Sequence, residues 1–198
     1  LALAAAGARV AVTGRTLAKL DQTGALIAER GGEALPIEGN VKDPDSLAAM
    51  VARTAERFGG LDILVNNAQE VPNGKLLDVT DEAFLAGFES GPLASFRLMK
   101  LAHPLMVARG GGVIVNTASV QGLQSALGVA PYAASKGGDL SLTRQLALEY
   151  AKDNIRVLAV NPGTIETPLV AESAAAVGQT IDGLRAKWAA CHPLDRIG

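Results

Sequence analysis

The sequence is poor in cysteine and in aromatic residues, and it carries little net charge. Its 198 residues include one cysteine, so no disulfide can form within the chain, and we expect a cytoplasmic protein from a reducing compartment. Aromatic residues make up 4%, which leaves Ala, Val, Leu and Ile to build the core. The 18 basic and 20 acidic residues give a net charge of −2, too balanced for a protein that binds nucleic acid electrostatically.

Long apolar segments are lacking as well. The longest stretch without a charged residue, between Arg109 and Lys136, contains amide and hydroxyl side chains and Pro131, so it cannot span a bilayer. Leu1 to Ala8 are apolar or glycine, but they lack the basic start and cleavage site of a signal peptide. Hydrophobic residues, at 48%, outnumber charged residues, at 19%, which excludes disorder for the bulk of the chain.

Apolar runs of strand length alternate with helical patterns. The predicted strands are 10–13, 34–37, 61–65, 113–115 and 155–160, and the predicted helices are 16–30, 44–58, 80–108 (with a kink at Pro104) and 131–152. The strands are apolar throughout rather than at every second residue, which is typical of a parallel sheet covered by helices on both faces. No repeat or linker divides the chain, so the pattern predicts an α/β fold in one domain, residues 1–198.

Small and polar residues follow each predicted strand. In parallel sheets, ligands bind beyond the carboxyl ends of the strands. The segments at these ends are Thr13–Arg15, Asn40, Asn66–Ala68, Thr117–Ser119 and Asn161–Thr167. One such segment alone is more often an ordinary turn. Five of them along one edge predict a binding site.

Three side chains near this edge form a catalytic pattern. Tyr132 and Lys136 are four residues apart on one helix face, and Ser119 ends the preceding strand. A phenol is a poor acid–base catalyst at neutral pH, but an ammonium about 4 Å away favours the phenolate by ~4 kcal/mol at an effective dielectric of ~20, before desolvation. A serine hydroxyl opposite would polarise a carbonyl oxygen. Tyr and Lys at this spacing are a weak motif alone and a strong one with the rest.

Further motifs stand in a fixed order along the chain. They are Gly7-Ala-Arg-Val10, Leu61-Asp-Ile-Leu-Val-Asn-Asn-Ala68, Ile114-Val-Asn-Thr-Ala-Ser119, Tyr132-Ala-Ala-Ser-Lys136 and Asn161-Pro-Gly-Thr-Ile-Glu-Thr167. With these motifs the sequence resembles the short-chain dehydrogenase/reductase family from Leu1 to Gly198. The resemblance implies a doubly wound, Rossmann-like parallel sheet with helices on both faces, which binds a nicotinamide dinucleotide.

The resemblance also implies a role for each matching residue. Tyr132 exchanges the proton with the substrate oxygen, Ser119 hydrogen-bonds that oxygen, and Lys136 stabilises the phenolate and holds the nicotinamide ribose. The other implied cofactor contacts are Asn40 and Val41 at the adenine, Asn67 and Ala68 at the adenosine-side ribose and phosphates, and Pro162, Gly163, Ile165 and Thr167 at the nicotinamide.

The end of the strand at 10–13 predicts the choice of cofactor. In this fold an acidic residue there binds the ribose 2′-hydroxyl, whereas a nearby arginine accommodates the 2′-phosphate of NADP. Gly14 stands at the acidic position and Arg15 follows it. We therefore expect NADP(H) in preference to NAD(H), with Arg15 at the phosphate. The alternative is that Arg15 is a solvated charge at a helix start.

The chain departs from the family pattern at both ends. The first family strand, with its glycine-rich phosphate turn, should precede Leu1, and another helix and the final strand should follow Gly198. We therefore expect a domain truncated at both ends, with a gap in the sheet between strands 10–13 and 61–65.

Two residues inside the chain also depart from the pattern. Gly91, followed by Pro92, stands where the family usually has a catalytic Asn that holds a water in a proton relay, so we expect altered proton transfer. The Gly-Pro pair should also disturb the helix locally. Gln69 replaces the usual glycine after Ala68, and we expect its side chain near the nicotinamide.

These observations predict an NADP(H)-dependent carbonyl reductase or alcohol dehydrogenase with a small-molecule substrate, similar to reductases of 3-oxoacyl thioesters. The competing interpretation is a nucleotide-binding or regulatory protein that kept the fold and lost turnover. Gly91 slightly favours that interpretation, and the Ser119, Tyr132 and Lys136 set disfavours it. The resemblance further implies a homotetramer and an apolar lid over 164–192. No metal site is expected, because His103 and His192 lack a second ligand at metal spacing.

Overall fold

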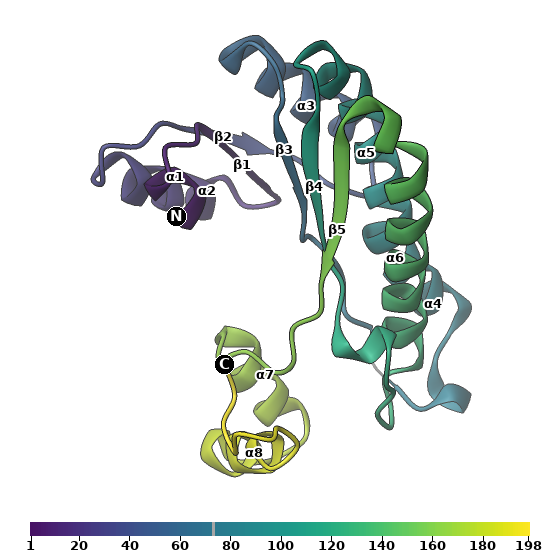
Figure 1. Cartoon of the computed structure of the whole chain (residues 1–198). Helices are drawn as coiled ribbons and strands as arrows, with labels where there is room; N and C mark the ends of the chain where they lie inside the picture. Colours follow the sequence, from purple (N-terminus) through teal and green to yellow (C-terminus); the bar gives the residue numbers. More distant parts are fainter. Residues whose placement is uncertain (73) are drawn as a thin grey trace. The chain divides into compact units, whose positions relative to one another are not determined.

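The computed structural model describes residues 1–72 and 74–198 (Figure 1). The chain divides into two compact units, Leu1–Val160 and Asn161–Gly198, and each is described by itself. No helix in the described residues is long and apolar enough to cross a membrane.

Strands and helices alternate in the first unit in the predicted order. Its strands are β1 (Val10–Gly14), β2 (Ala34–Glu38), β3 (Ile63–Asn66), β4 (Gly112–Thr117) and β5 (Ile155–Val160). Its α-helices are α1 (Ala2–Ala5), α2 (Leu17–Ala28), α3 (Pro44–Phe58), α4 (Asp81–Phe88), α5 (Ala94–Ala108) and α6 (Ala130–Glu149), with short helical turns η1 (Leu76–Asp78), η3 (Val120–Gly122) and η4 (Ala151–Asp153).

Local sequence signals explain several helix ends. The Asp43 carboxylate accepts a hydrogen bond from the Asp45 amide, and Pro44 occupies the first turn, so α3 begins where predicted. The helix ends at Gly59, whose φ of 79° is the left-handed conformation that glycine adopts most readily. Thr80 caps α4 in the same way, through its hydroxyl and the Ala83 amide.

The helix predicted over 80–108 is interrupted in its middle. A π-helical turn, η2 (Glu89–Leu93), separates α4 from α5, and Gly91 departs from helical angles with φ −96° and ψ −107°. The Gly91–Pro92 pair explains the interruption, because Pro92 has no backbone N–H to continue the helical hydrogen bonds. Pro104 was expected to produce the kink, but α5 continues through it.

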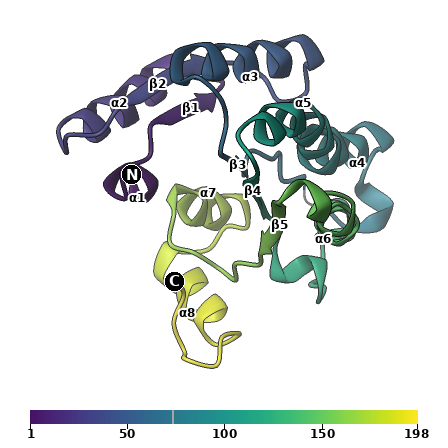
Figure 2. The same ribbon diagram turned by 45° about the horizontal axis from the view of Figure 1, so that its top comes forward.

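All strand pairs are parallel, as predicted. The strands form two sheets, β1–β2 and β3–β4–β5, and among the described residues no ladder joins β1 to β3, which is where a gap was expected. Helix α2 packs on the β1–β2 sheet, whereas α5 and α6 pack on the β3–β4–β5 sheet (Figures 1 and 2).

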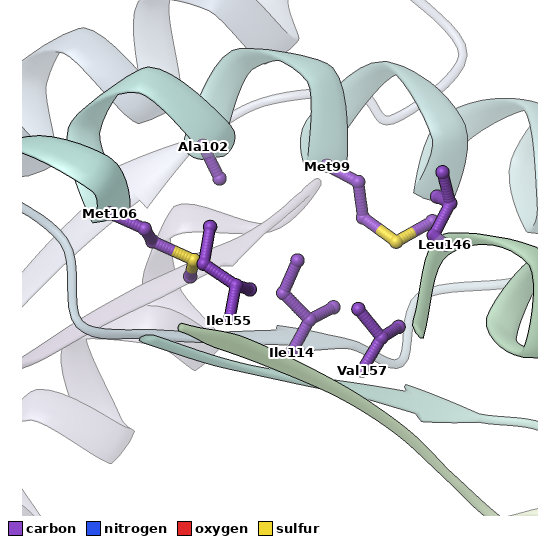
Figure 3. Close-up of a cluster of buried hydrophobic side chains, with 7 residues drawn as sticks. All are labelled: Met99, Ala102, Met106, Ile114, Leu146, Ile155 and Val157. Carbon is purple, nitrogen blue, oxygen red and sulfur yellow. The ribbon is translucent and has the colours of Figure 1, made fainter. Parts of the chain in front are cut away.

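A buried apolar cluster fixes α5 and α6 on the sheet. Figure 3 shows side chains of α5 pointing down onto those of β4 and β5; the members are Met99, Ala102, Met106, Ile114, Leu146, Ile155 and Val157. Complete burial of a large apolar side chain contributes about 1.5–3 kcal/mol. A second cluster of Ile37, Leu47 and Met50 joins β2 to α3, and Leu98 of α5 packs against it. Helices α3 and α5 therefore connect the two sheets.

The second unit consists of α7 (Pro168–Ala176), α8 (Ile181–Ala189) and the segments around them. The Arg185 guanidinium donates two hydrogen bonds of 2.8 Å to the Glu166 carboxylate, which ties α8 to the segment before α7. Gly198 donates to the Thr164 carbonyl, and its own carbonyl accepts from the Glu166 amide.

Candidate functional site

A buried chain of polar side chains fixes the carboxyl ends of β3 and β4. Asn66 and Asn116 are partners in the strand register, and the Asn66 Nδ2 donates to the Asn116 Oδ1 at 2.8 Å. The Asn116 Nδ2 donates in turn to the Thr143 Oγ1 on α6 at 2.9 Å. Because unpaired polar groups are costly in a core, this network fixes the positions of β3, β4 and α6 relative to one another. The sequence-predicted segments after Asn66 and Asn116 therefore begin from fixed positions.

Ser119 lies directly after β4 and is buried, with 6% of its surface exposed. Its Oγ accepts a hydrogen bond from the Gln121 amide at 3.1 Å and caps η3. A hydroxyl that accepts one bond still has its proton to donate. Ser119 can therefore donate to a carbonyl oxygen without losing its structural contact.

Tyr132 and Lys136 share a face of α6, as predicted. The Lys136 Nζ lies 5.8 Å from the centre of the Tyr132 ring. The same Nζ donates to the Thr117 carbonyl at the end of β4, at 2.5 Å. Among the described residues, no direct hydrogen bond joins Ser119, Tyr132 and Lys136. The structure brings the lysine to the phenol ring, and the serine precedes both along the β4–α6 connection.

Lys136 has a buried acidic neighbour that the sequence analysis missed. Asp139 lies one turn further along α6, and its Oδ2 is 3.3 Å from the Lys136 Nζ. Burial lowers the pKa of the Lys136 ammonium, and the adjacent carboxylate opposes that effect. Burial likewise raises the pKa of Asp139, and Lys136 opposes it. The available signal was an acid three residues after the lysine, which places both on one helix face.

Gln69 connects three elements of the site. Its Nε2 donates to the Ser135 Oγ at 2.6 Å, and Ser135 donates to the Tyr132 carbonyl at 2.8 Å. A Cβ placed on Gly91 would lie 3.1 Å from the Gln69 Cδ and Nε2. The Gln69 Oε1 is buried and has no hydrogen-bond partner in the described part of the chain. The amide therefore lies between the bend in η2 and the first turn of α6.

Positive side chains gather at the ends of β1 and β2. Arg15 and Lys42 both reach the Glu70 carboxylate, at 3.4 Å and 3.3 Å, and Lys42 also lies 4.0 Å from Glu89. Arg15 was predicted here, whereas Lys42 and Glu70 were missed. The Arg15 side chain is 71% exposed, so its ion pair with Glu70 is weak and another anion can replace Glu70 at a small cost in free energy.

The adenine-side residues have mainly local contacts. The Asn40 amide donates to the Ser46 Oγ, and the Asn40 Oδ1 accepts from the Lys42 amide, which shapes the turn after β2. Val41 packs against the second apolar cluster. Asn67 and Ala68 are exposed after β3.

The remaining predicted cofactor residues lie in the second unit. They are Pro162, Gly163, Ile165 and Thr167, and Thr167 is the residue before α7. The His192 Nε2 accepts from the Thr164 amide at 3.1 Å, and its Nδ1 lies 2.8 Å from the Trp188 carbonyl. A Cβ on Gly163 would lie 2.5 Å from the His192 Nε2, so a larger residue there would displace the imidazole from this position. His192 thus has a structural role, since it joins α8 to the segment before α7.

A cavity of about 490 Å³ adjoins the connection between β4 and α6. Its lining comes mostly from the connection between Ser119 and Tyr132 and from the start of α6, namely Gln121, Gly122, Leu123, Ser125, Ala126, Leu127, Gly128, Ala130, Ala133 and Ala134, with Gly74 and Leu76. Ser119, Tyr132 and Lys136 flank this lining and do not belong to it.

Comparison with known proteins identifies the family of this chain. The family model described as short chain dehydrogenase matches residues 1–178. An uncharacterised oxidoreductase of Thermotoga maritima is 42% identical over 162 residues, which cover 81% of this chain and 63% of that protein. The chain thus spans less than two thirds of the length of this relative.

Solved structures with different cofactors share the fold. The structure of actinorhodin polyketide ketoreductase with NADPH has a TM-score of 0.93 and 35% identity, covering 99% of this chain and 77% of that one. The structure of 7α-hydroxysteroid dehydrogenase with NADH has a TM-score of 0.80 and 28% identity, covering 86% of this chain and 69% of that one. The motif order, the parallel sheets with helices on both faces and the family match agree: the chain belongs to the short-chain dehydrogenase/reductase family of oxidoreductases.

Proposed function

We propose that the protein containing this chain is an NADP(H)-dependent oxidoreductase that interconverts a carbonyl compound and a secondary alcohol. The observation that carries the proposal is the approach of the Lys136 ammonium to the Tyr132 ring, next to a β4 end that bears Ser119. A positive charge near the ring favours the phenolate over the phenol.

Each of the three side chains has one task in the proposed reaction. In the reducing direction, the Ser119 hydroxyl donates to the carbonyl oxygen and holds it beside the Tyr132 Oη. A nicotinamide cofactor, when bound, would supply the hydride for the carbonyl carbon. Tyr132 gives its proton to the oxygen as the alcohol forms, and the Lys136 ammonium stabilises the phenolate that remains. In the oxidising direction the same phenolate accepts the alcohol proton.

The charge at the ends of β1 and β2 supports NADP(H). Arg15 and Lys42 converge on the Glu70 carboxylate, so the pair already binds one anionic group, and the 2′-phosphate of NADP is an anion of suitable charge for the same cations. In this proposal the implied contacts of the cofactor are Arg15 at the phosphate, Asn40 and Val41 at the adenine, Asn67 and Ala68 along the ribose and phosphates, Lys136 at the nicotinamide ribose, and Pro162, Gly163, Ile165 and Thr167 at the nicotinamide. The structure of the hydroxysteroid dehydrogenase contains NADH, so the preference of this protein for NADPH over NADH has to be measured.

The substrate class follows from the reaction and from one relative. A ketone or its secondary alcohol fits the three side chains, and the ketoreductase relative acts in polyketide synthesis by its name. We include oxoacyl compounds among the first substrates to try. We also propose a homo-oligomer, supported by exposed apolar side chains on α5 such as Phe96, at 45% exposure.

The deciding experiment measures NADPH consumption by the whole protein with a panel of ketones and oxoacyl compounds. We expect turnover with at least one carbonyl and a loss of at least about a hundredfold in Tyr132→Phe, the range of general acid catalysis. Tight NADPH binding without turnover would support the regulatory alternative instead. Equal turnover in Tyr132→Phe would remove the role proposed for that residue.

A further inference from the structure

Lys136 and Asp139 form an ion pair in the interior of the first unit. Lys136 is 4% exposed and Asp139 is 3% exposed. The Nζ lies 3.3 Å from the Asp139 Oδ2, while the Oδ1 is buried and has no hydrogen-bond partner among residues 1–72 and 74–198. The carboxylate therefore makes one contact with a charged group, and that group is the lysine of the proposed reaction.

Neutral groups surround the rest of the pair. The Thr117 carbonyl accepts from the Lys136 Nζ, and the Thr143 hydroxyl donates to the Asp139 carbonyl. Through Asn116, Thr143 continues the polar chain to the end of β3. These contacts fix the backbone and the ammonium but supply no second negative charge.

Charged groups on the elements packed against α6 are engaged elsewhere or face solvent. Glu89 of η2 lies against Lys42, and Asp153 of η4 lies against His103. The other charged residues of α4, η4, β5 and the last turns of α6 are exposed, namely Asp81, Glu82, Arg144, Glu149, Lys152 and Arg156. In the described part of the chain, Asp139 is thus the negative charge in contact with the Lys136 ammonium.

Burial of an ammonium favours its neutral form unless an opposite charge lies close by. A lysine that loses its proton gives no electrostatic stabilisation to a phenolate. The charge that the proposed mechanism requires on Lys136 therefore depends on a carboxylate that touches neither substrate nor cofactor.

We infer that Asp139 is a positioning residue that keeps Lys136 protonated in its buried site and thereby sets the pH at which Tyr132 exchanges its proton. This inference rests on the proposed function. Asp139 stays a carboxylate throughout and takes no proton from Lys136, so the proton balance remains that of Tyr132 and the substrate oxygen. Two effects of Asp139 oppose each other, since its charge holds the lysine proton but also repels a phenolate. Because Asp139 contacts the ammonium directly, we expect the first effect to prevail.

The test compares Asp139→Asn, which keeps the shape and removes the charge, with the parent protein. Tyr132 ionisation is followed in the cofactor-free protein as the phenolate absorbance that disappears in Tyr132→Phe. We expect the phenolate to form at higher pH in Asp139→Asn, by about one pH unit or more. We expect the pH profile of alcohol oxidation to move in the same direction, and the rate at neutral pH to fall roughly tenfold for each pH unit by which the profile moves.

Two further variants control for structural effects. Asp139→Glu keeps the charge and should restore much of the parental profile, whereas Asp21→Asn removes an exposed carboxylate on α2 and should change nothing. If Asp139→Asn does not fold, the inference is tested on Asp139→Glu, whose longer side chain should move the phenolate titration by less than a pH unit and leave activity measurable. If Asp139→Glu folds and its phenolate titration moves by more than one pH unit, the result would contradict a role of Asp139 that depends on its charge.

The direction in which the titration moves decides the inference. A phenolate that forms at the same or lower pH in Asp139→Asn would show that Lys136 keeps its proton unaided, and would overturn it. The proposed function fails by a different result, tight NADPH binding by the parent protein without turnover of any carbonyl. The two failures are therefore distinguishable.

Discussion

The side-chain amide of Gln69 occupies the space next to the Cα of Gly91, where a Cβ would lie 3.1 Å from the Gln69 Cδ and Nε2. Both residues depart from the family pattern, and the structure places these two departures against each other. The Gln69 Nε2 bonds to Ser135, whose hydroxyl holds the Tyr132 carbonyl. One amide group thus spans from the bend in η2 to the helix that carries Tyr132 and Lys136.

This packing predicts that substitutions at the two positions are not independent. Gly91→Asn should displace the Gln69 amide and lose its bond to Ser135, and Gln69→Ala should lose the same bond, each at a cost of about 1 kcal/mol. The double variant should cost less than the sum by about 0.5–2 kcal/mol, because truncating the glutamine to a methyl group leaves room for the new asparagine amide. Urea unfolding of the four proteins measures this coupling. Strictly additive effects would show that the contact between Gln69 and Gly91 does not contribute to the free energy of unfolding.

A second prediction concerns the cofactor. Arg15→Ala and Lys42→Ala should each weaken NADPH binding by roughly five- to tenfold and leave NADH binding nearly unchanged, because each removes a cation from the proposed phosphate site. Dissociation constants for both cofactors, measured by fluorescence at low and high salt, test this. Arg30→Ala, which removes an exposed arginine in the turn after α2, is the matched control.

Glu70 should have the opposite effect to the two cations. In the structure it pairs with both, so it competes with an incoming phosphate for them. Glu70→Gln should therefore tighten NADPH binding a few-fold, more at low salt than at high salt, since exposed charges are screened. Weaker NADPH binding in this variant would instead assign Glu70 to the cofactor site as a direct contact.

The sequence was sufficient for features that depend on local chemistry. Asp43 and Gly59 mark the ends of α3 as predicted, and the shared helix face of Tyr132 and Lys136 follows from their spacing alone. The order of strands and helices followed from the alternation of apolar runs.

Contacts between distant segments could not be predicted in the same way. Gln69 meets Ser135 across 66 residues, and Arg15 meets Glu70 across 55. These contacts depend on how distant elements such as α5 and α6 pack on the sheet, and a local sequence pattern does not encode that packing. The Gly91–Pro92 pair predicted a local disturbance of the helix over 80–108, but no local pattern gave its extent, a π-helical turn that separates α4 from α5.

A fourth prediction concerns Gly163 in the second unit. A Cβ there would lie 2.5 Å from the His192 Nε2, so Gly163→Ala should displace the imidazole from the Thr164 amide. We expect faster hydrogen exchange at Thr164, roughly tenfold or more, corresponding to about 1.4 kcal/mol or more of local stability. His192→Ala removes the same bond, so combining the two should add little. Unchanged hydrogen-exchange protection of the Thr164 amide in Gly163→Ala would indicate that the segment around Thr164 is stable without the bond to His192.

The last prediction uses the opposite directions in which burial moves the pKa values of Lys136 and Asp139. Burial lowers the Lys136 pKa, so its contribution to stability is present above the lysine's usual value of 10.5 and is lost as pH falls through the folded value. Burial raises the Asp139 pKa, so its contribution is present below the usual value of 3.8 and is lost as pH rises through the folded value.

Asp139→Asn removes the contribution of the Asp139 carboxyl to the pH dependence of stability. It also extends the contribution of Lys136 to lower pH, because Lys136 loses its counter-charge. The free energy of unfolding of this variant should therefore rise more steeply with pH than that of the parent below pH 10.5, by up to about 1.4 kcal/mol per pH unit. Urea unfolding at constant ionic strength, in steps across this range, measures the slope, and Asp21→Asn should keep the parental one. A parental slope in Asp139→Asn would mean that the proton on Lys136 does not depend on Asp139.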